Sequence, residues 1–391
     1  MKVRHLHRDE RGISLIFVSA GLAGFLAATS LAIDVGMMMM ARSQAQNSAD
    51  AGALGGATAL VFNSFTDRSS TGPAVTSTIS TAQANLIVEQ PPSVLISDVT
   101  FPNDPTGNPT RVAVSVYRTT ARGNAIPTFL GGMFGVPTAD IGASATAEAS
   151  PANAETCVKP FMIPDKWTEN SDDKGVFDGP WTPDSEFNMV DNKGKPLPNP
   201  DVYVPLGHTG YTGYSSMDYG TRLILRAGTG TNIFPTMYYS WSMPSNTGGD
   251  DYRGNISGCN QTQIPISIDP PYYMTQEPGN MVGPTNQGID DLIARDPAAT
   301  FDRSCVCVRG SRYGVSPRVT PIPLYDPVYY ATGKMNGRNA DFRLANVIGF
   351  FIDTRVGNQV YGYIMPVLGT IDPNAGPAPS GSFPAAIRLV Q

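Results

Sequence analysis

Four cysteines are the residues of this sequence best suited to covalent chemistry: Cys157, Cys259, Cys305 and Cys307. All four follow an uncharged N-terminal stretch that could cross a membrane, and thiols outside the cytoplasm commonly form disulfides. Three pairings are possible. Residues two apart along a strand point to the same side but lie too far apart to bond directly. We therefore expect Cys157 and Cys259 each to pair with one member of the Cys305/Cys307 pair, rather than a zinc site, for which paired CxxC spacing is missing.

Histidine is scarce, and this limits the catalytic chemistry that the chain could support. Only His208 lies outside the N-terminal tail, so a three-histidine zinc site and an HExxH pair are excluded there. A Ser-His-Asp triad would have to use His208. Because His208 lies in the turn-rich segment PLGHTGYTGYSS, we interpret it as a surface or turn residue.

An acidic loop, ENSDDKGVFDG (169–179), is the remaining candidate for ligand chemistry. Its side chains Asp172, Asp173 and Asp178 could supply oxygen ligands to calcium, but the twelve-residue EF-hand spacing is absent. The pattern is more typical of a solvated acidic loop. No spacing singles out a carboxylate pair for glycoside hydrolysis. We expect no catalytic residue, no cofactor and no metal, and we expect that the protein is not an enzyme.

The composition favours a body of short strands and many turns. Gly and Pro number 40 and 34, charged residues make up 15%, and the net charge is −6. A Gly- and Pro-rich chain could also be disordered, but 16 Tyr and 16 Phe indicate a packed interior. The acidic balance argues against a nucleic-acid partner, because phosphate binding depends on clustered Lys and Arg.

The N-terminal elements predict a membrane anchor. Residues 1–12 form a basic tail, and 13–33 (ISLIFVSAGLAGFLAATSLAI) carry no charge. A helix of that length spans about 31 Å, close to one hydrocarbon core. Basic residues before the span orient the N-terminus to the cytoplasm. A cleaved signal ending near Ser30-Leu31-Ala32 is the alternative, but the apolar run is too long for one and the helical pattern continues past it.

Small residues recur at four-residue spacing along this helix. Within the span the row is Ala20, Gly24 and Ala28, a spacing that lets two membrane helices approach closely. Beyond the span the row continues as Ala45, Ala49 and Ala53 in MMMMARSQAQNSADAGALGGATAL (37–60). An Ala-rich stripe buries little apolar area, so we expect it to serve close contact with another helix or a small domain.

Three short segments carry a resemblance to a known family. They are RG at 11–12, AIDVG at 32–36 and QNSADAGALGGATAL at 46–60. In this order behind a basic N-terminus, they resemble the N-terminal region of the TadE/TadG-like proteins of Tad (Flp-type) pilus systems. The motif positions here are Gly12, Asp34, Gln46, Asp50 and Leu54. The resemblance is clear over about residues 11–60 and looser to residue 150.

The resemblance implies an assembly role, with two departures from the family pattern. Processed pilin-like members carry Glu five residues after the cleaved Gly, whereas Phe17 stands there in this sequence. A permanently anchored protein is therefore favoured over a processed one. The metal-binding DxSxS of a von Willebrand A-like domain is also missing, since residues 140–144 read DIGAS.

Together these patterns predict an α+β fold. We expect a basic cytoplasmic tail (1–12), a transmembrane helix (13–33), an Ala-rich extracytoplasmic helix (34–62), a small α/β domain (63–150) and a mostly-β domain (151–391). In the small domain, 74–90 and 126–135 are predicted helices, and 93–101, 110–120 and 138–149 are predicted strands. The C-terminal domain is predicted to be a sandwich or a barrel.

The functional prediction is a single-pass protein of the bacterial inner membrane, with its C-terminal domain outside the cytoplasm. It would act as a structural component of Tad pilus assembly, and its expected partners are other pilus-assembly proteins or pilin-like subunits. An alternative class is a membrane-tethered module that binds or hydrolyses envelope polysaccharide. A third is a surface adhesin released after signal cleavage.

Overall fold

A computed structural model of the chain describes residues 11–63, 67–105, 107–172, 174–191, 193–228, 232–244, 248–335 and 341–390. Residues 1–10, the predicted basic tail, and Asp173 of the acidic loop lie outside this range. The chain divides into two compact units. The first comprises 1–60, 66–148 and 388–391, and the second comprises 61–65 and 149–387.

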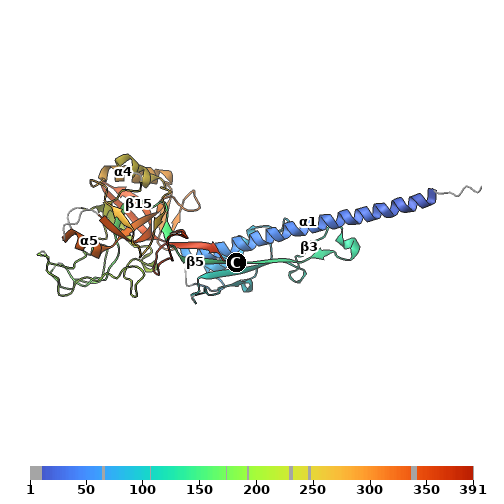
Figure 1. Ribbon diagram of the computed structural model, residues 1–391, viewed down its shortest axis with the longest axis horizontal. Helices are drawn as coiled ribbons and strands as arrows, with labels where there is room; N and C mark the ends of the chain where they lie inside the picture. The colour runs from blue at the N-terminus through green and yellow to red at the C-terminus, as the bar shows by residue number, and fades with distance from the viewer. Residues whose placement is uncertain are drawn as a thin grey trace, which may run out of the picture. The chain divides into compact units, whose positions relative to one another are not determined.

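The first unit is built on one long helix, α1 (Arg11–Phe62), which is continuous past the end of the uncharged stretch. No proline interrupts it, and alanine, a strong helix former, recurs through its second half. A second helix, α2 (Pro73–Ala84), begins with proline in its first turn, where the missing N–H costs nothing. Figure 1 shows α1 running along the strands of this unit.

The sheet of the first unit has the order β1-β2-β5-β17. Its strands are β1 (Val99–Thr100), β2 (Arg111–Arg118), β5 (Ile141–Pro151) and β17 (Ala385–Leu389). Strand β2 alternates strictly between buried and half-buried residues, with Val112, Val114 and Val116 on the buried face. This alternation was the strand signal read from the sequence.

Three elements of this unit differ from the sequence prediction. Of the strand predicted over 93–101, only β1 (Val99–Thr100) forms, after a 3₁₀ turn at Ile96–Asp98. The helix predicted over 74–90 ends at Ala84, and a bridge between Ile87 and Gln90 follows. The helix predicted over 126–135 is instead a hairpin of β3 (Ile126–Pro127) and β4 (Thr138–Ala139). Only a single 3₁₀ turn, Gly131–Phe134, lies between these strands, because Pro and three Gly in the segment 126–135 disfavour a longer helix.

The second unit contains a closed, six-stranded barrel. Around the ring the strands run β15, β14, β7, β9, β8 and β16, and β16 pairs with β15 to close it. The pairs β14/β7 and β8/β9 are parallel, and the other four are antiparallel. The strands are β7 (Phe161–Pro164), β8 (Arg222–Ala227), β9 (Met237–Ser240), β14 (Val319–Tyr325), β15 (Asp341–Val356) and β16 (Gln359–Met365).

Strand β15 closes the barrel because it is long enough to pair with three neighbours. Its sixteen residues pair with β11 (Tyr273–Thr275) near the start, with β14 through the middle and with β16 toward the end. At Gly349 a Cβ atom would lie 2.9 Å from Cβ of Val367, so only glycine lets the chain pass this closely.

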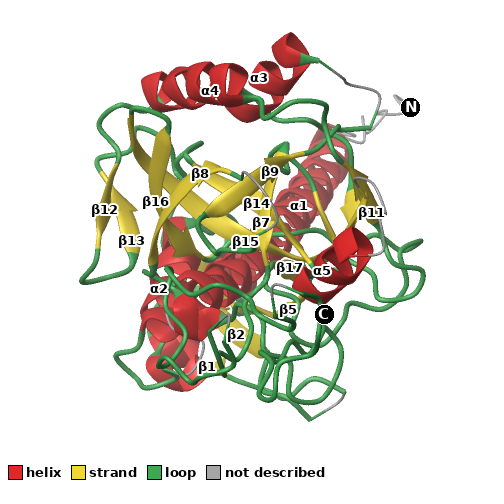
Figure 2. Cartoon of the chain, turned by 90° about the vertical axis from the view of Figure 1, so that its left-hand side faces the viewer, coloured by secondary structure: helices red, strands yellow, loops and turns green. Residues whose placement is uncertain are grey.

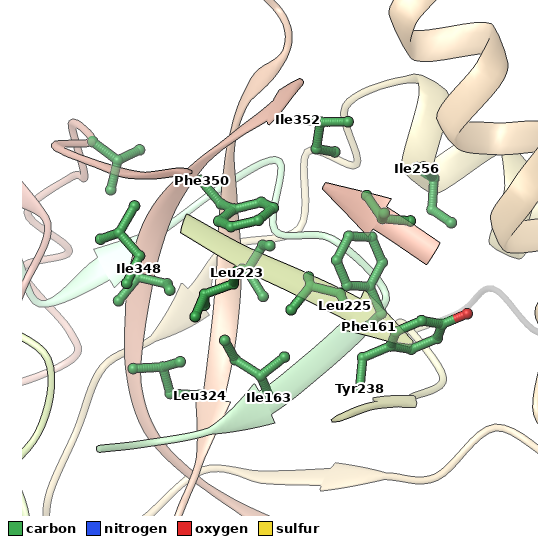
Figure 3. Packing of buried hydrophobic residues seen from close by; sticks show 14 of the residues in the cluster. Phe161, Ile163, Leu223, Leu225, Tyr238, Ile256, Leu324, Ile348, Phe350 and Ile352 are labelled. Atoms are coloured by element: carbon green, nitrogen blue, oxygen red, sulfur yellow. The ribbon is translucent and has the colours of Figure 1, made fainter. Parts of the chain in front are cut away.

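Apolar side chains from all six strands fill the barrel interior, as Figure 3 shows for Phe161, Leu223, Ile348 and Phe350. Helix α3 (Gly249–Ser257) contributes Ile256 to the same core, and helix α4 (Val282–Arg295) contributes Ile289 and Leu292. The two helices lie together over the barrel strands (Figure 2). The remaining elements are α5 (Pro327–Met335), the hairpin of β12 (Thr300–Asp302) and β13 (Cys307–Arg309), and the pair β6 (Ala154–Glu155) and β10 (Ile264–Pro265). The predicted α+β class is confirmed.

Both disulfides form in the second unit, but not with the predicted pairing. Cys157 bonds to Cys259, and Cys305 bonds to Cys307. The expectation assumed that Cys305 and Cys307 lie in one extended strand. Instead β13 begins only at Cys307, and Val306 adopts a left-handed φ of 51°. This turn reduces the Cα–Cα distance of the pair to 5.2 Å, which is within the range of a disulfide.

Candidate interaction site on the N-terminal helix

The two halves of α1 have opposite exposure. From residue 14 to 33 the side chains are exposed or half-exposed except for Ser30. The exposed large apolar side chains of this half are Leu15, Ile16, Phe17, Val18, Leu22, Phe25, Leu26, Leu31 and Ile33. Among the described residues, α1 is the one helix that is long and apolar enough to span a membrane. The predicted packing positions Ala20, Gly24 and Ala28 lie in this exposed half.

In the second half, one face of α1 is buried by the rest of its own unit. The buried side chains recur every fourth residue, at Ala41, Ala45, Ala49, Ala53 and Ala57, with Ser48 beside them. This spacing keeps them in one row along the helix.

Helix α2 lies against this row at close range. The Ser48 hydroxyl donates a 2.8 Å hydrogen bond to the carbonyl of Ala82. A Cβ atom at Gly52 would lie 2.8 Å from Cβ of Ala82, and 3.4 Å from Cγ1 of Val114 on β2. The small residues therefore let α1 fit closely between α2 and the sheet.

The polar motif residues connect α1 to the sheet of the same unit. The Gln46 amide donates to the Asp50 carboxylate at 2.7 Å and to the backbone carbonyl of Ser144 on β5 at 3.3 Å. Asp50 thus orients the amide that contacts the sheet. Leu54 is half-buried, and Gly12 is the second residue of α1.

Asp34 attaches the β3–β4 hairpin to α1. Its carboxylate accepts hydrogen bonds from three consecutive backbone N–H groups, those of Phe129 (2.6 Å), Leu130 (3.3 Å) and Gly131 (2.9 Å). No sequence spacing relates Asp34 to a hairpin almost a hundred residues away, so only the folded chain shows this contact. A groove of about 810 Å³ lies between α1 (residues 27–42) and the hairpin (residues 128–141).

Replacement of Asp34 by Ala is expected to loosen the hairpin. Hydrogen bonds to a charged acceptor contribute about 1.5–3 kcal/mol each, although water replaces part of this when the acceptor is lost. We expect amide hydrogen exchange of residues 128–137 in the full-length protein to accelerate by about tenfold or more. Asp50→Ala is the matched control, since Asp50 contacts Gln46 rather than the hairpin. Equal exchange in both variants would contradict the assigned role of Asp34.

A comparison with known families finds a match within α1. Residues 12–59 match the family model described as putative Flp pilus-assembly TadE/G-like. The match contains all five motif residues read from the sequence, and it confirms the resemblance stated for this segment. It supports a role of the segment in pilus assembly. The comparisons with curated proteins and with solved structures gave no significant match.

The candidate chemical residues of the second unit occupy structural positions. His208 is exposed in a turn, where its N–H donates to Pro205 and its carbonyl accepts from Tyr211. In the acidic loop, Asp172 accepts from the backbone N–H groups of Lys174 and Val176, both at 2.9 Å. Within the described residues, no group of three or more His, Cys, Asp or Glu side chains is placed to hold a metal ion.

Asp165 is a fully buried carboxylate that the sequence reasoning did not single out. It accepts hydrogen bonds from the hydroxyls of Tyr211 (2.8 Å) and Tyr203 (3.1 Å) and from the N–H of Tyr214 (3.1 Å). Burial raises its pKa to about 6, although these hydrogen bonds act in the opposite direction. It fastens the tyrosine-rich segment 203–214 to the chain that follows β7.

Glu155 on β6 is buried and has no cationic partner among the residues that the structure describes, which makes the stability of this unit depend on pH. Burial raises its pKa to about 8 from an ordinary value of 4.5. Between these values the folded chain keeps a proton that the unfolded chain releases, so stability falls as pH rises. One such group contributes at most about 1.4 kcal/mol per pH unit.

Glu155→Gln is therefore expected to remove this slope. We expect the difference in unfolding free energy between variant and wild type to shift in favour of the variant from pH 5 to pH 7. Urea unfolding followed by tryptophan fluorescence measures it, since all three Trp lie in the second unit. The range stops at pH 7 because burial lowers the pKa of Lys159 to about 7, and that group contributes an opposite slope above this pH. If the difference in unfolding free energy between Glu155→Gln and the wild type is the same at pH 5 and pH 7, the raised pKa of Glu155 is contradicted.

Proposed function

We propose that the protein is a single-pass, membrane-anchored structural component of Tad (Flp-type) pilus assembly. The first half of α1 crosses the bacterial inner membrane, and the chain that follows it lies outside the cytoplasm. The protein acts through helix packing and protein–protein contacts rather than catalysis. Its partners are other pilus-assembly proteins or pilin-like subunits.

The division of α1 into an exposed apolar half and an attached half carries this proposal. The exposed half is as long as a bilayer core is thick, and among the described residues only its last turns, from Ala27 to Leu31, lie beside another part of the chain. The buried half fixes the direction in which α1 leaves its own unit. The family match over residues 12–59 supplies the link to pilus assembly.

Ala20 and Gly24 of the small-residue row are the proposed contact face for a partner helix, and Ala28 of the same row lines the groove between α1 and the β3–β4 hairpin. A Cβ atom at Gly24 would meet no other heavy atom within 4 Å, so a neighbouring backbone could approach here. Leu22 and Leu26 lie about 200° around the helix from this row and form the opposite face. We propose that lipid covers the opposite face and that a pilus component covers the small-residue face.

Site-specific photo-crosslinking in pilus-producing cells tests the function. With a crosslinker at Gly24, we expect a covalent product with a membrane protein of the pilus apparatus, identified by mass spectrometry. A crosslinker at Leu26 is expected to give several-fold less of this product. Deletion of the gene should reduce surface pili, and the wild-type chain should restore them. Normal pili in the deletion strain, together with extraction of the protein by carbonate, would reject the proposal.

A further inference from the structure

The β3–β4 hairpin presents an apolar surface that the assembly role does not use. No charged residue occurs from Gly123 to Ala139. At its turn, the side chains of Phe129, Met133 and Phe134 are 68%, 80% and 65% exposed, and Val136 is exposed beside them. Contiguous exposed apolar side chains of this kind mark contact with a partner or a membrane.

The position of the hairpin along α1 indicates which of these it contacts. The groove between the two is lined by Ala27, Leu31 and Val35 of α1, and by Phe134 and Val136 of the hairpin. Ala27 precedes Asp34 by seven residues, which corresponds to about 10 Å along a helix. The hairpin turn therefore runs beside the last two turns of the uncharged stretch 13–33, toward the N-terminal end of α1 (Figure 1).

The groove also changes polarity along α1. Arg42 and Asp140 line it together with the apolar residues, and Arg42 lies about 12 Å farther along α1 than Asp34, away from the span. Apolar lining at the level of the span and charged groups farther out match the order of acyl chains and headgroups in a leaflet.

The backbone of the turn satisfies many of its own polar groups, which lowers the cost of leaving water. Asp34 accepts from three of its N–H groups. The N–H of Met133 donates to Leu130 at 3.0 Å and that of Val136 donates to Gly131 at 2.9 Å. The Thr128 hydroxyl donates to the Val136 carbonyl at 2.6 Å.

We propose that the hairpin turn, residues 128–137, is a second membrane element, inserted into the extracytoplasmic leaflet with phospholipid acyl chains filling its groove against α1. This inference rests on the membrane anchoring in the proposed function. Asp34 holds the turn at that depth by bonding it to the end of the span. With two elements in the bilayer, the tilt and the rotation of α1 relative to the membrane are fixed.

Fluorescence quenching in phosphatidylcholine–phosphatidylglycerol liposomes tests the insertion with the full-length protein. An environment-sensitive fluorophore is attached at Met133→Cys; the four native cysteines are disulfide-bonded and do not compete for the label. Val18→Cys in the span is the lipid reference, and Thr71→Cys, exposed beyond the far end of α1, is the water reference. We expect spin-labelled lipid to quench the probe at 133 at least half as strongly as the probe at 18. We also expect iodide to quench it several-fold less than the probe at 71.

A second variant separates insertion from a general effect of the label. Phe129→Asp combined with Phe134→Asp, in the Met133→Cys background, is expected to abolish lipid quenching at 133. If iodide quenches the probe at 133 as strongly as the probe at 71, while the probe at 18 remains in lipid, the hairpin proposal alone is overturned. Probes at 133 and 18 that both remain in water overturn the anchoring as well. Protection from iodide without lipid quenching indicates a protein on this face and also overturns the proposal.

Discussion

Gly52→Leu is expected to separate α1 from α2 and to destabilise the first unit by about 3 kcal/mol or more. Even a single added carbon at Gly52 would lie 2.8 Å from Cβ of Ala82 and 3.2 Å from the backbone oxygen of Thr78. Neither neighbour is the end of a flexible side chain, so the helices themselves must move. The gain in helix propensity from replacing glycine, about 1 kcal/mol, is too small to offset this.

Gly36→Leu is the matched control for this prediction. It places the same side chain on the same helix, at an exposed position where a Cβ atom meets nothing within 4 Å. We expect it to leave the unit unchanged or slightly more stable. Hydrogen exchange of α2 and β2 amides measures both variants, because the first unit contains no tryptophan. Similar protection in the two variants would show that the close contact of α1 with α2 contributes little.

Arg318→Met is expected to destabilise the second unit by about 3–5 kcal/mol, because it removes the donors for four backbone carbonyls. The buried guanidinium donates to the carbonyls of Ile352 (2.8 Å), Asp296 (3.0 Å), Ala299 (2.9 Å) and Asp353. These groups belong to the end of β15 and to the segment after α4. A methionine of similar length fills the space but leaves the carbonyls without donors.

Arg309→Met separates the loss of this network from the loss of a positive charge. Arg309 is an exposed arginine in the same unit, and its ion pair with Asp302 at 2.6 Å lies at the surface. Exposed pairs contribute about 0–1 kcal/mol, so a small effect is expected. Urea unfolding followed by tryptophan fluorescence compares the two variants. A loss below about 1 kcal/mol for Arg318→Met would mean that water replaces the lost donors.

Local patterns in the sequence predicted the elements whose signal lies in neighbouring residues. The uncharged stretch and the Ala spacing predicted α1, and the alternation of Val112, Val114 and Val116 predicted β2. The segment 126–135 of the hairpin was predicted as a helix because apolar residues close together are compatible with either element. The hairpin is held by a contact with a helix distant in sequence, because Asp34 of α1 accepts hydrogen bonds from the N–H groups of the turn.

Contacts that depend on local backbone conformation or on distant residues required the tertiary structure. The Cys305–Cys307 bond depends on the left-handed backbone at Val306, and β-branched residues rarely reveal such a conformation in a sequence. The barrel closes because β15 pairs with both β14 and β16, and the chain returns through β17 to the sheet of the first unit. Packing and register across the whole chain decide which strands pair, and a short stretch of sequence does not contain this information.

The sequence by itself determined that the chain has a long apolar helix with small residues along it, followed by a strand-rich body with four cysteines. These properties follow from hydrophobicity, charge and spacing, which act over a few residues. Only the tertiary structure decided that the outer Ala row packs within its own unit, that Asp34 holds a hairpin beside the span, and which cysteines pair. The helix and hairpin contacts and the Cys157–Cys259 bond join segments far apart in the chain, whereas the Cys305–Cys307 bond depends on the left-handed backbone of Val306. The free energy of each contact depends on atoms that folding brings together.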